Sequence, residues 1–364
     1  MATARGRSSA GLQCSLMRQR SAIRNYFEYG LALLVLKSLE FAPLPLAHWL
    51  ARRYVGLLDL AIPRLRRVAY RNLSMALPEA NAVAIVDGVF RSIARTIVTF
   101  AKFPSIRKDN VARWIRCEGG EHFETALREG RGVLFATAHM GNWELSAYGH
   151  SLLREPMNVV VRPLDNPLID RLVERRRGLS GNRPIFKKDF ARSILKALAA
   201  NQAVGILIDQ NASLDAGTVR GGGGDGADRG EKAASKARDQ GVARGPGGPP
   251  HSVGSSVFVD FFGIPACAGT GFAKLAARSR AAVIPGFALW SEEERGYVLR
   301  FYPPVPITGD AALDTQTLQT RLEEVIRAYP DQWLWIHRRW KTRPPGEPSL
   351  YETTPGRGGA SNTL

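Results

Sequence analysis

Apolar residues recur at two different periods along this 364-residue chain, and the change of period divides it. Within 83–103 they are spaced three and four residues apart, which is the period of a helix with one buried face. The positions in question are Val86, Val89, Phe90, Ile93, Ile97 and Phe100. We therefore expect helices over 52–105. From about residue 130 onward, short apolar runs replace this pattern.

Five of these short runs have the length of a buried strand. They are Val133–Ala136, Asn158–Val161, Val204–Ile208, Val257–Phe262 and Ala282–Leu289. Helical patterns separate several of them, for example at 190–200 and 271–278. Strands that alternate with helices indicate an α/β fold, with a mixed, partly parallel sheet flanked by helices.

The stretch 26–50 is rich in Leu, Ala and Phe, but three charged residues and two prolines interrupt it. A membrane-spanning helix needs about 20 mostly apolar residues, and no uninterrupted run here is that long. We favour a helix that lies in or on the membrane and ends near Pro43 and Pro45. A tilted single span and an ordinary buried helix are the alternatives. No small-residue cleavage site follows the run, which argues against a signal peptide.

The charge of the chain points to anionic partners. Fifty Lys and Arg residues stand against 33 Asp and Glu, giving a net charge of +17. Five arginines and no acid occur in 1–24, and six arginines against one aspartate occur in 51–71. These two clusters flank the apolar stretch, an arrangement that suits an anionic membrane surface better than nucleic acid. A solvated basic face is the alternative.

The three cysteines are far apart and form no CxxC pair, which argues against a disulfide scaffold and against a cysteine-based zinc site. Residues 214–256 hold 12 of the 36 glycines and no Phe, Tyr or Trp, so they are expected to form a disordered insertion. The predicted organisation is a basic disordered leader, a helical membrane-associating region, an α/β domain and a loose tail. These segments cover 1–24, 25–105, 106–343 and 344–364.

The most informative chemistry follows the first predicted strand, where His139 precedes Glu144 by five residues. On an ideal helix five residues turn about 500°, so the two side chains would diverge. They can meet only if His139 lies on the loop before the helix, and Gly141 and Asn142 suit such a turn. If they meet, Glu144 fixes the imidazole tautomer and the other ring nitrogen can take a proton from a hydroxyl. We predict His139 as general base and Glu144 as the residue that orients it.

The string from His139 to Glu144, with Gly-Asn-Trp inside it, resembles the first motif of the bacterial lipid A late (lauroyl/myristoyl) acyltransferases. These belong to the lysophospholipid acyltransferase-like superfamily. Two blocks upstream resemble the N-terminal signature of the family: Arg71–Leu73 and Leu77–Glu79. Further blocks that resemble the family follow the first motif in order: Val161–Pro167, Gly205–Gln210, Phe261–Ala266, Val283–Pro285 and Trp333–Trp340. The resemblance runs from about 25 to 342. The long insertion and the weak apolar segment near the N-terminus depart from the family pattern.

This resemblance implies a membrane-associated O-acyltransferase at the cytoplasmic face of the bacterial inner membrane. The expected donor is an acyl thioester, acyl-acyl carrier protein, and the expected acceptor is a hydroxyl of a glycolipid such as a lipid A precursor. An acidic carrier protein suits a strongly basic surface. Anionic membrane lipid is a further expected partner, whereas nucleic acid, a cofactor and a metal are not expected. The alternatives are an acyl-CoA-dependent transferase for another glycolipid or phospholipid, and a non-catalytic module that binds anionic lipid.

Four more residues are assigned to the substrate-binding part of the site. Arg162 follows a predicted strand and could hold a phosphate or the developing oxyanion, with a structural salt bridge as the alternative. Asp209 ends another strand and could orient Arg162 or a substrate hydroxyl, or only form a turn. Gly141 and Asn142 are expected to shape the turn and support the site.

Several aromatic and basic residues leave two interpretations open. Trp333, Trp335 and Trp340 either lie at the lipid interface or pack the last element. The pair at 261–262 either lines an acyl groove or belongs to the core. The basic run 175–177 either meets an anionic group or is a solvated face.

Overall fold

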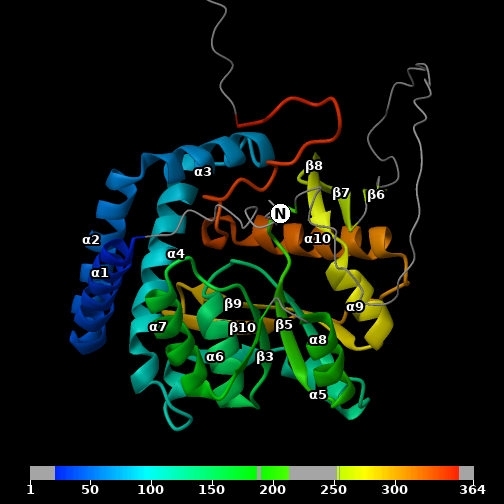
Figure 1. The fold of residues 1–364 in the computed structure, drawn as a ribbon, viewed down its shortest axis with the longest axis horizontal. Coiled ribbons are helices and arrows are strands. Elements are labelled where there is room, and N and C mark those ends of the chain that lie inside the picture. The colour runs from blue at the N-terminus through cyan, green and yellow to red at the C-terminus, as the bar shows by residue number, and fades with distance from the viewer. Residues whose placement is uncertain (1–20, 187–189, 213–251, 254, 352–364) are drawn as a thin grey trace, which may run out of the picture.

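The centre of the molecule is a seven-stranded sheet in the order β1–β10–β9–β2–β5–β3–β4 (Figure 1). The computed structural model describes residues 21–186, 190–212, 252–253 and 255–351. Neighbouring strands of this sheet are parallel except for the antiparallel pair β9–β10. The bounds are β1 Ile115–Glu118, β2 Val133–Thr137, β3 Asn158–Val161, β4 Arg183–Phe186, β5 Ala203–Leu207, β9 Ala282–Ser291 and β10 Gly296–Phe301. The expected mixed, partly parallel sheet is confirmed.

Helices cover both faces of this sheet, and the side chains of β2 alternate between them. Phe135 packs in a cluster with residues of α5 and α6, whereas Leu134 and Ala136 pack with residues of α8, α9 and α10. A strand buried on both faces has a continuous apolar sequence, which is why the run at 133–136 was recognisable. The bounds are α5 Gly120–Arg128, α6 Trp143–Leu153, α7 Pro167–Arg177, α8 Phe190–Ala199, α9 Gly271–Ser279 and α10 Ala311–Ala328.

The run expected as a strand at 257–262 does not belong to the central sheet. It lies in a separate antiparallel sheet of β6 Ser252–Val253, β7 Ser256–Phe261 and β8 Ile264–Gly269. Phe261 pairs with Ile264, so only two residues connect β7 to β8. Phe262 and Gly263 both have positive φ, of 60° and 72°. Such a two-residue turn returns the chain at once and forces an antiparallel hairpin.

The N-terminal region is helical, and the prolines interrupt it as expected. The helices are α1 Ala22–Phe41, α2 Leu44–Ala61, α3 Pro63–Ala76 and α4 Ala82–Lys102. Pro43 precedes α2 and Pro45 lies in its first turn, where a missing N–H costs no helical hydrogen bond. No helix in the described part of the chain is long and apolar enough to cross a membrane. Figure 1 shows α1 and α2 at one side of the molecule, beyond α4.

A third apolar cluster joins the N-terminal helices to the small sheet and to the end of the chain. Trp333, Trp335 and Trp340 are fully buried in it, with Phe261 and Phe262. The interpretation of these tryptophans as residues of the lipid interface is therefore wrong, because none of the three side chains is exposed. The amide of Asn72 donates to the carbonyls of Trp335 and His337, at 2.7 and 2.8 Å.

Most of the predicted leader, insertion and tail lies outside the described residues. Where the structure reaches their edges, it differs from the expectation. Strand β6 lies inside the range assigned to the insertion, 214–256. Residues 344–351, assigned to the loose tail, contact α3: the Tyr351 hydroxyl donates to Asn72 Oδ1 at 2.7 Å. Residues 344–351 therefore belong to the described fold and not to a loose tail.

Candidate active site

A short loop between β2 and α6 carries His139, as the motif required. Gly141 has a φ of 57°, and a Cβ there would lie 2.0 Å from the carbonyl oxygen of Ala288. Only glycine fits such a position. Asn142 caps α6, because its side-chain oxygen accepts a hydrogen bond from the Leu145 N–H at 3.0 Å. The chain thus leaves the sheet, turns sharply and enters the helix within five residues.

The tryptophan-rich segment at the end of the chain holds this loop in place. Met140 and Trp333 form an isolated β-bridge. The His139 carbonyl accepts from the Leu334 N–H at 3.0 Å, and the Gly141 N–H donates to the carbonyl of Gln332 at 2.8 Å. The backbone around His139 is therefore held from both sides by residues almost 200 positions away in sequence.

The partner of the imidazole is Asp209. The distance between His139 Nδ1 and Asp209 Oδ1 is 3.0 Å, and the His139 backbone N–H donates to Oδ2 of the same carboxylate, also at 3.0 Å. The indole N–H of Trp333 donates to Oδ2 at 3.1 Å. Asp209 is fully buried, whereas the His139 side chain is 17 % exposed. This carboxylate is thus fixed by three donors and presents one oxygen to the ring.

The electrostatics of the pair favour an ionised acid and a basic imidazole. Burial alone would lower the pKa of His139, but the hydrogen bond and charge of Asp209 and the charge of Glu144 outweigh it, so the pKa is raised. Burial opposes ionisation of Asp209 as well. The hydrogen bonds and charge of His139 outweigh that effect and hold the pKa of this carboxyl far below its usual range.

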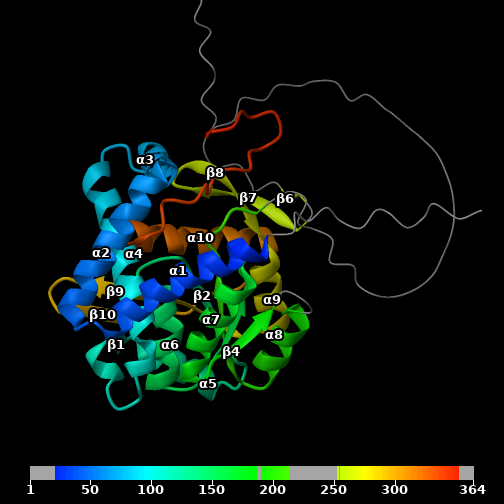
Figure 2. The ribbon, with the colours of Figure 1, turned by 60° about the vertical axis from the view of Figure 1, so that its left-hand side comes forward.

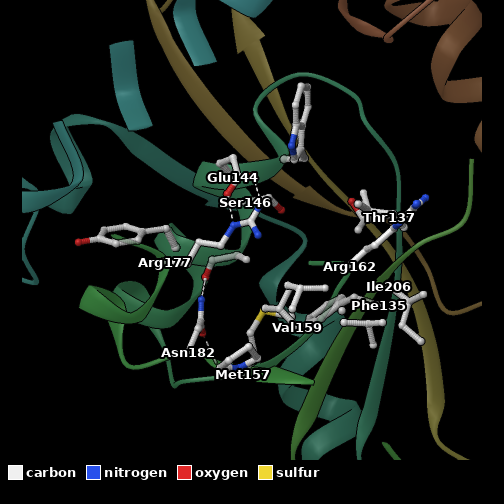
Figure 3. Close-up of a pocket in the computed structure, with 18 of the residues that line it drawn as sticks. Phe135, Thr137, Glu144, Ser146, Met157, Val159, Arg162, Arg177, Asn182 and Ile206 are labelled. Carbon is white, nitrogen blue, oxygen red and sulfur yellow. Dashed lines mark hydrogen bonds and ion pairs between the residues drawn. The ribbon is translucent and has the colours of Figure 1, made fainter. Parts of the chain in front are cut away.

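Glu144 forms its hydrogen bonds with Arg177 and not with the imidazole, which corrects the sequence-based expectation. Its carboxylate accepts a bidentate pair from Arg177, with Nε to Oε2 at 2.8 Å (Figure 3). The ring nitrogen Nδ1 instead meets Asp209 at the end of β5. The reason is topological: β2 and β5 are adjacent parallel strands, so the residues after their carboxyl ends are brought together.

A cavity of about 810 Å³ opens beside His139 and extends into the core. Polar and charged side chains line its outer part, including His139, Glu144 and Arg177. Its inner part is lined mainly by buried apolar side chains and by small residues of the sheet. These inner residues include Phe135, Met157, Val159, Gly205, Ile206, Gly286 and Phe301. Figure 3 shows Phe135, Val159 and Met157 on one side of the pocket and Glu144 with Arg177 on another.

The other expected site residues divide into two groups. Arg162 lines the cavity with an exposed side chain directly after β3. Asp209, Asn142 and Gly141 are not among the residues that line it. They hold the loop and the imidazole, so the structure gives them a supporting position where the sequence suggested contact with substrate.

Arg177 and His150 both line the cavity; sequence reasoning left Arg177 open as part of the basic run and did not single out His150. The basic run 175–177 is neither wholly solvated nor wholly a binding face. Arg176 is buried and donates to the Ala101 carbonyl at 2.7 Å, whereas Arg177 binds Glu144. Helical spacing could have separated these two directions once α7 was known, but nothing in the sequence distinguishes His150.

No group of three or more His, Cys, Asp or Glu side chains in the described ranges is arranged to hold a metal ion. The arrangement as it stands can withdraw a proton from a group placed at His139 Nε2. The adjoining cavity can receive an extended apolar chain.

Comparisons with known proteins agree on one family. The model of the family described as bacterial lipid A biosynthesis acyltransferase matches residues 17–219 and 249–342. The unmatched segment between these ranges falls within the predicted insertion.

Individual relatives match over most of their length. The chain is 28% identical over 307 residues to the lipid A biosynthesis lauroyltransferase of Escherichia coli (strain K12), covering 81% of this chain and 86% of that protein. It is 26% identical over 318 residues to the lipid A biosynthesis palmitoleoyltransferase of the same strain, covering 85% and 89%. A phosphatidylinositol mannoside acyltransferase of Mycobacterium tuberculosis (strain ATCC 25618 / H37Rv) is 25% identical over 251 residues, covering 66% and 65%.

Proposed function

The chain belongs to the bacterial lipid A biosynthesis acyltransferase family and is an acyltransferase, and from this premise we propose its reaction. It transfers a fatty acyl chain from an acyl thioester, acyl-acyl carrier protein, to a hydroxyl of a lipid A-type glycolipid. The observation that carries this proposal is the hydrogen bond between His139 and the buried Asp209 beside the cavity.

His139 acts as the general base in this reaction. Asp209 is ionised and accepts a hydrogen bond from the Nδ1–H group, which leaves Nε2 unprotonated and able to accept a proton. Nε2 takes the proton of the acceptor hydroxyl while its oxygen attacks the thioester carbonyl carbon. The tetrahedral intermediate collapses, the C–S bond breaks, and the imidazolium returns the proton to the leaving sulfur. The products are an ester and a free thiol, and no covalent enzyme intermediate is formed.

Three charged side chains at the cavity support this step. Glu144 lies close enough for its charge to raise the pKa of His139, so it stabilises the imidazolium that forms during attack. Arg177 fixes the Glu144 carboxylate through its bidentate contact. Arg162 lines the same cavity and supplies positive charge for the oxyanion or for a phosphate of the acceptor.

The inner part of the cavity holds the acyl chain. It is lined by buried apolar side chains, so a hydrocarbon chain that enters it leaves water at a gain of about 25 cal/mol per Å² of apolar surface. The carbonyl then stays at the polar outer part, beside His139. The inner part of the cavity thus binds the acyl chain, and the outer part carries the residues that act on its carbonyl.

Helices α1 and α2 place the enzyme on an anionic membrane. Of the eighteen large apolar side chains exposed in the described residues, thirteen lie between Ile23 and Ile62. Exposed arginines, among them Arg52 and Arg53, accompany them. Such a combination of apolar and basic side chains is typical of helices that lie in the membrane interface. The excess of arginine also favours the cytoplasmic side of the inner membrane.

The same helices lie next to the outer part of the cavity. The side-chain amide of Asn166, at the start of α7, donates to the carbonyl of Asn25 in α1 at 3.0 Å. Leu164 and Asp165, which line the cavity, immediately precede it. Figure 2 shows α1 running across α7. A membrane-bound acceptor would therefore reach His139 from the side that carries the exposed apolar residues.

A second candidate is an acyl-CoA-dependent transferase for another glycolipid. The match to a phosphatidylinositol mannoside acyltransferase favours it. Competition between acyl-acyl carrier protein and acyl-CoA, with each glycolipid in turn, separates the two. A module that only binds anionic lipid would leave the His139–Asp209 pair without a purpose, and its binding would be indifferent to changes at either residue.

The test is acyl transfer by the full chain, using acyl-acyl carrier protein and a lipid A precursor in membrane vesicles. His139→Ala should lower kcat by about 10² to 10⁴-fold, the usual contribution of general base catalysis. His122→Ala is the matched control, because His122 lies on α5 and does not line the cavity. Unchanged transfer by the His139 variant at normal protein levels would remove the mechanism.

A further inference from the structure

A second histidine lies in the wall of the cavity, in its inner part. His150 belongs to α6 and packs edge-on against the rings of Phe123, Phe135 and Phe301, with centroids 4.8, 5.2 and 5.8 Å away. Phe135 and Phe301 line the cavity with it. Only 2 % of the His150 surface is accessible to solvent. This imidazole therefore faces the region where the proposed reaction places the acyl chain.

Neither ring nitrogen of His150 has a hydrogen-bond partner in the described part of the chain. Burial lowers the pKa of His150 to about 3, so the ring is neutral and has one N–H donor and one acceptor nitrogen. A buried polar group without a partner costs free energy. A ligand that supplies both a donor and an acceptor would remove this cost.

The other polar side chains deep in the cavity already have partners. The Tyr148 hydroxyl donates to the carbonyl of Phe103 at 2.8 Å. The Asn182 side chain accepts from the Met157 N–H and donates to the carbonyl of Ala147, at 3.0 and 2.9 Å. Thr137 Oγ1 also lines the cavity without a partner in the described residues, but it lies at the level of His139. At the inner level, His150 is thus the side chain that can bind a polar group on the ligand without breaking a protein contact.

The depth of His150 sets where along the chain such a group would lie. Thr137 and Phe135 both line the cavity from β2, and two residues of extended strand span about 7 Å. Thr137 is near His139 and Phe135 touches His150. An extended chain advances about 1.2 Å per bond, so about six bonds separate the two levels. A hydroxyl next to the thioester carbonyl would not reach His150.

We propose that His150 is a specificity-determining residue that binds a hydroxyl borne partway along the acyl chain. One ring nitrogen of His150 binds this hydroxyl: it donates its N–H to the hydroxyl oxygen or, in the other tautomer, accepts the hydroxyl O–H. The favoured donor is a hydroxyacyl thioester oxygenated remote from its carbonyl. This inference rests on the proposed function, because it takes the cavity to be the acyl-chain site.

The experiment measures kcat/KM for lauroyl-acyl carrier protein and for its positional isomers, in which a single hydroxyl is moved one carbon at a time along the chain. The acceptor is a lipid A precursor in vesicles. One mid-chain isomer should exceed plain lauroyl thioester by about tenfold, the factor for one hydrogen bond to a buried group. Isomers with the hydroxyl beside the carbonyl should show no such gain.

His150→Phe is the decisive variant, because its ring suits the surrounding phenylalanines but has no hydrogen-bonding atom. The ratio of mid-chain hydroxylauroyl to lauroyl turnover should fall about tenfold or more. This ratio does not depend on how much of the variant folds. Met157→Leu is the matched control: it alters the same wall without removing a hydrogen-bonding group, so the preference should persist.

The outcomes separate this inference from the proposed function. If the wild-type enzyme transfers none of these chains, the proposed function fails. If it transfers all of them with equal kcat/KM, or if His150→Phe keeps the mid-chain preference, the inference about His150 is overturned while acyl transfer stands.

Discussion

Two buried histidines of this protein show how the surroundings of one side-chain type decide its chemistry. His139 meets a carboxylate and has a raised pKa, whereas His150 meets only aromatic rings and has a pKa lowered to about 3. Burial acts in the same direction on both rings. At His139 the hydrogen bond and the charge of Asp209, aided by the charge of Glu144, reverse its effect. One ring is therefore suited to accept a proton, and the other stays neutral at any physiological pH.

Asp209→Asn should change the pH dependence of transfer. The base works when deprotonated, so activity falls as the pH drops through the raised pKa of His139. Without the carboxylate charge that pKa falls, and the acid limb of the kcat/KM profile should move to lower pH. The plateau should also drop roughly 10²-fold, because the imidazolium loses its stabilising partner. An unmoved acid limb would show that Asp209 does not set the basicity; Glu79→Gln, an exposed carboxylate outside the cavity lining, serves as control.

His150→Phe should make folding less sensitive to acid. The folded protein keeps His150 neutral down to about pH 3, while the unfolded chain takes up a proton near the ordinary histidine pKa of 6.5. Protons then favour the unfolded state between these values, so stability falls as the pH falls, by up to about 1.4 kcal/mol per pH unit. Denaturant unfolding at several pH values measures this effect. As the pH drops from 6.5, the free energy of unfolding of the variant should rise relative to that of the wild type. His122→Phe is the control and should show no such trend. If the unfolding free energies of both variants depend on pH in the same way, the low pKa of His150 is contradicted.

At the scale of elements, the site depends on strand order more than on any one motif. Adjacent parallel strands β2 and β5 bring Asp209 under His139, and the segment after α10 closes over the loop through Trp333 and Leu334. Helix α3 supports that segment in turn through Asn72. Four of the motifs that resemble the family thus form one hydrogen-bonded assembly, although they are far apart in the sequence.

The first two helices offer an apolar surface that the rest of the fold leaves uncovered. Phe27 and Leu34 are 73% and 66% exposed. Replacing both by Glu should weaken binding to anionic vesicles, because it removes apolar surface that the membrane would bury and adds negative charge that anionic lipid repels. Cosedimentation with vesicles measures the effect, and at least a tenfold loss of partitioning is expected. Leu313→Glu is the control: it makes the same kind of substitution at an exposed position of α10 and should leave binding unaltered. Equal binding by all variants would place the membrane contact elsewhere.

At the scale of the whole molecule, two parts of the central sheet contribute to the site in different ways. The ends of β2, β3 and β5 carry the groups that we propose act on the substrate, and the interior between the sheet and α6 forms the cavity. The N-terminal helices pack onto the same core through α4, so they are part of the enzyme body and not a detachable anchor. One folded unit can therefore hold both the acyl chain and its thioester carbonyl. The proposed membrane-binding helices lie beside the opening of the cavity.

The sequence by itself determined the α/β class, four strands of the central sheet within about two residues, the helix 83–103 and the loop that carries His139. Apolar period, turn residues and ordered motifs are local properties, so they can be read without coordinates. It did not reveal the partner of His139, the pairing of Glu144 with Arg177, or the place of His150. These depend on which strands are neighbours and which helix faces turn inward, and contacts between residues 70 or more positions apart arise only when the whole chain has packed.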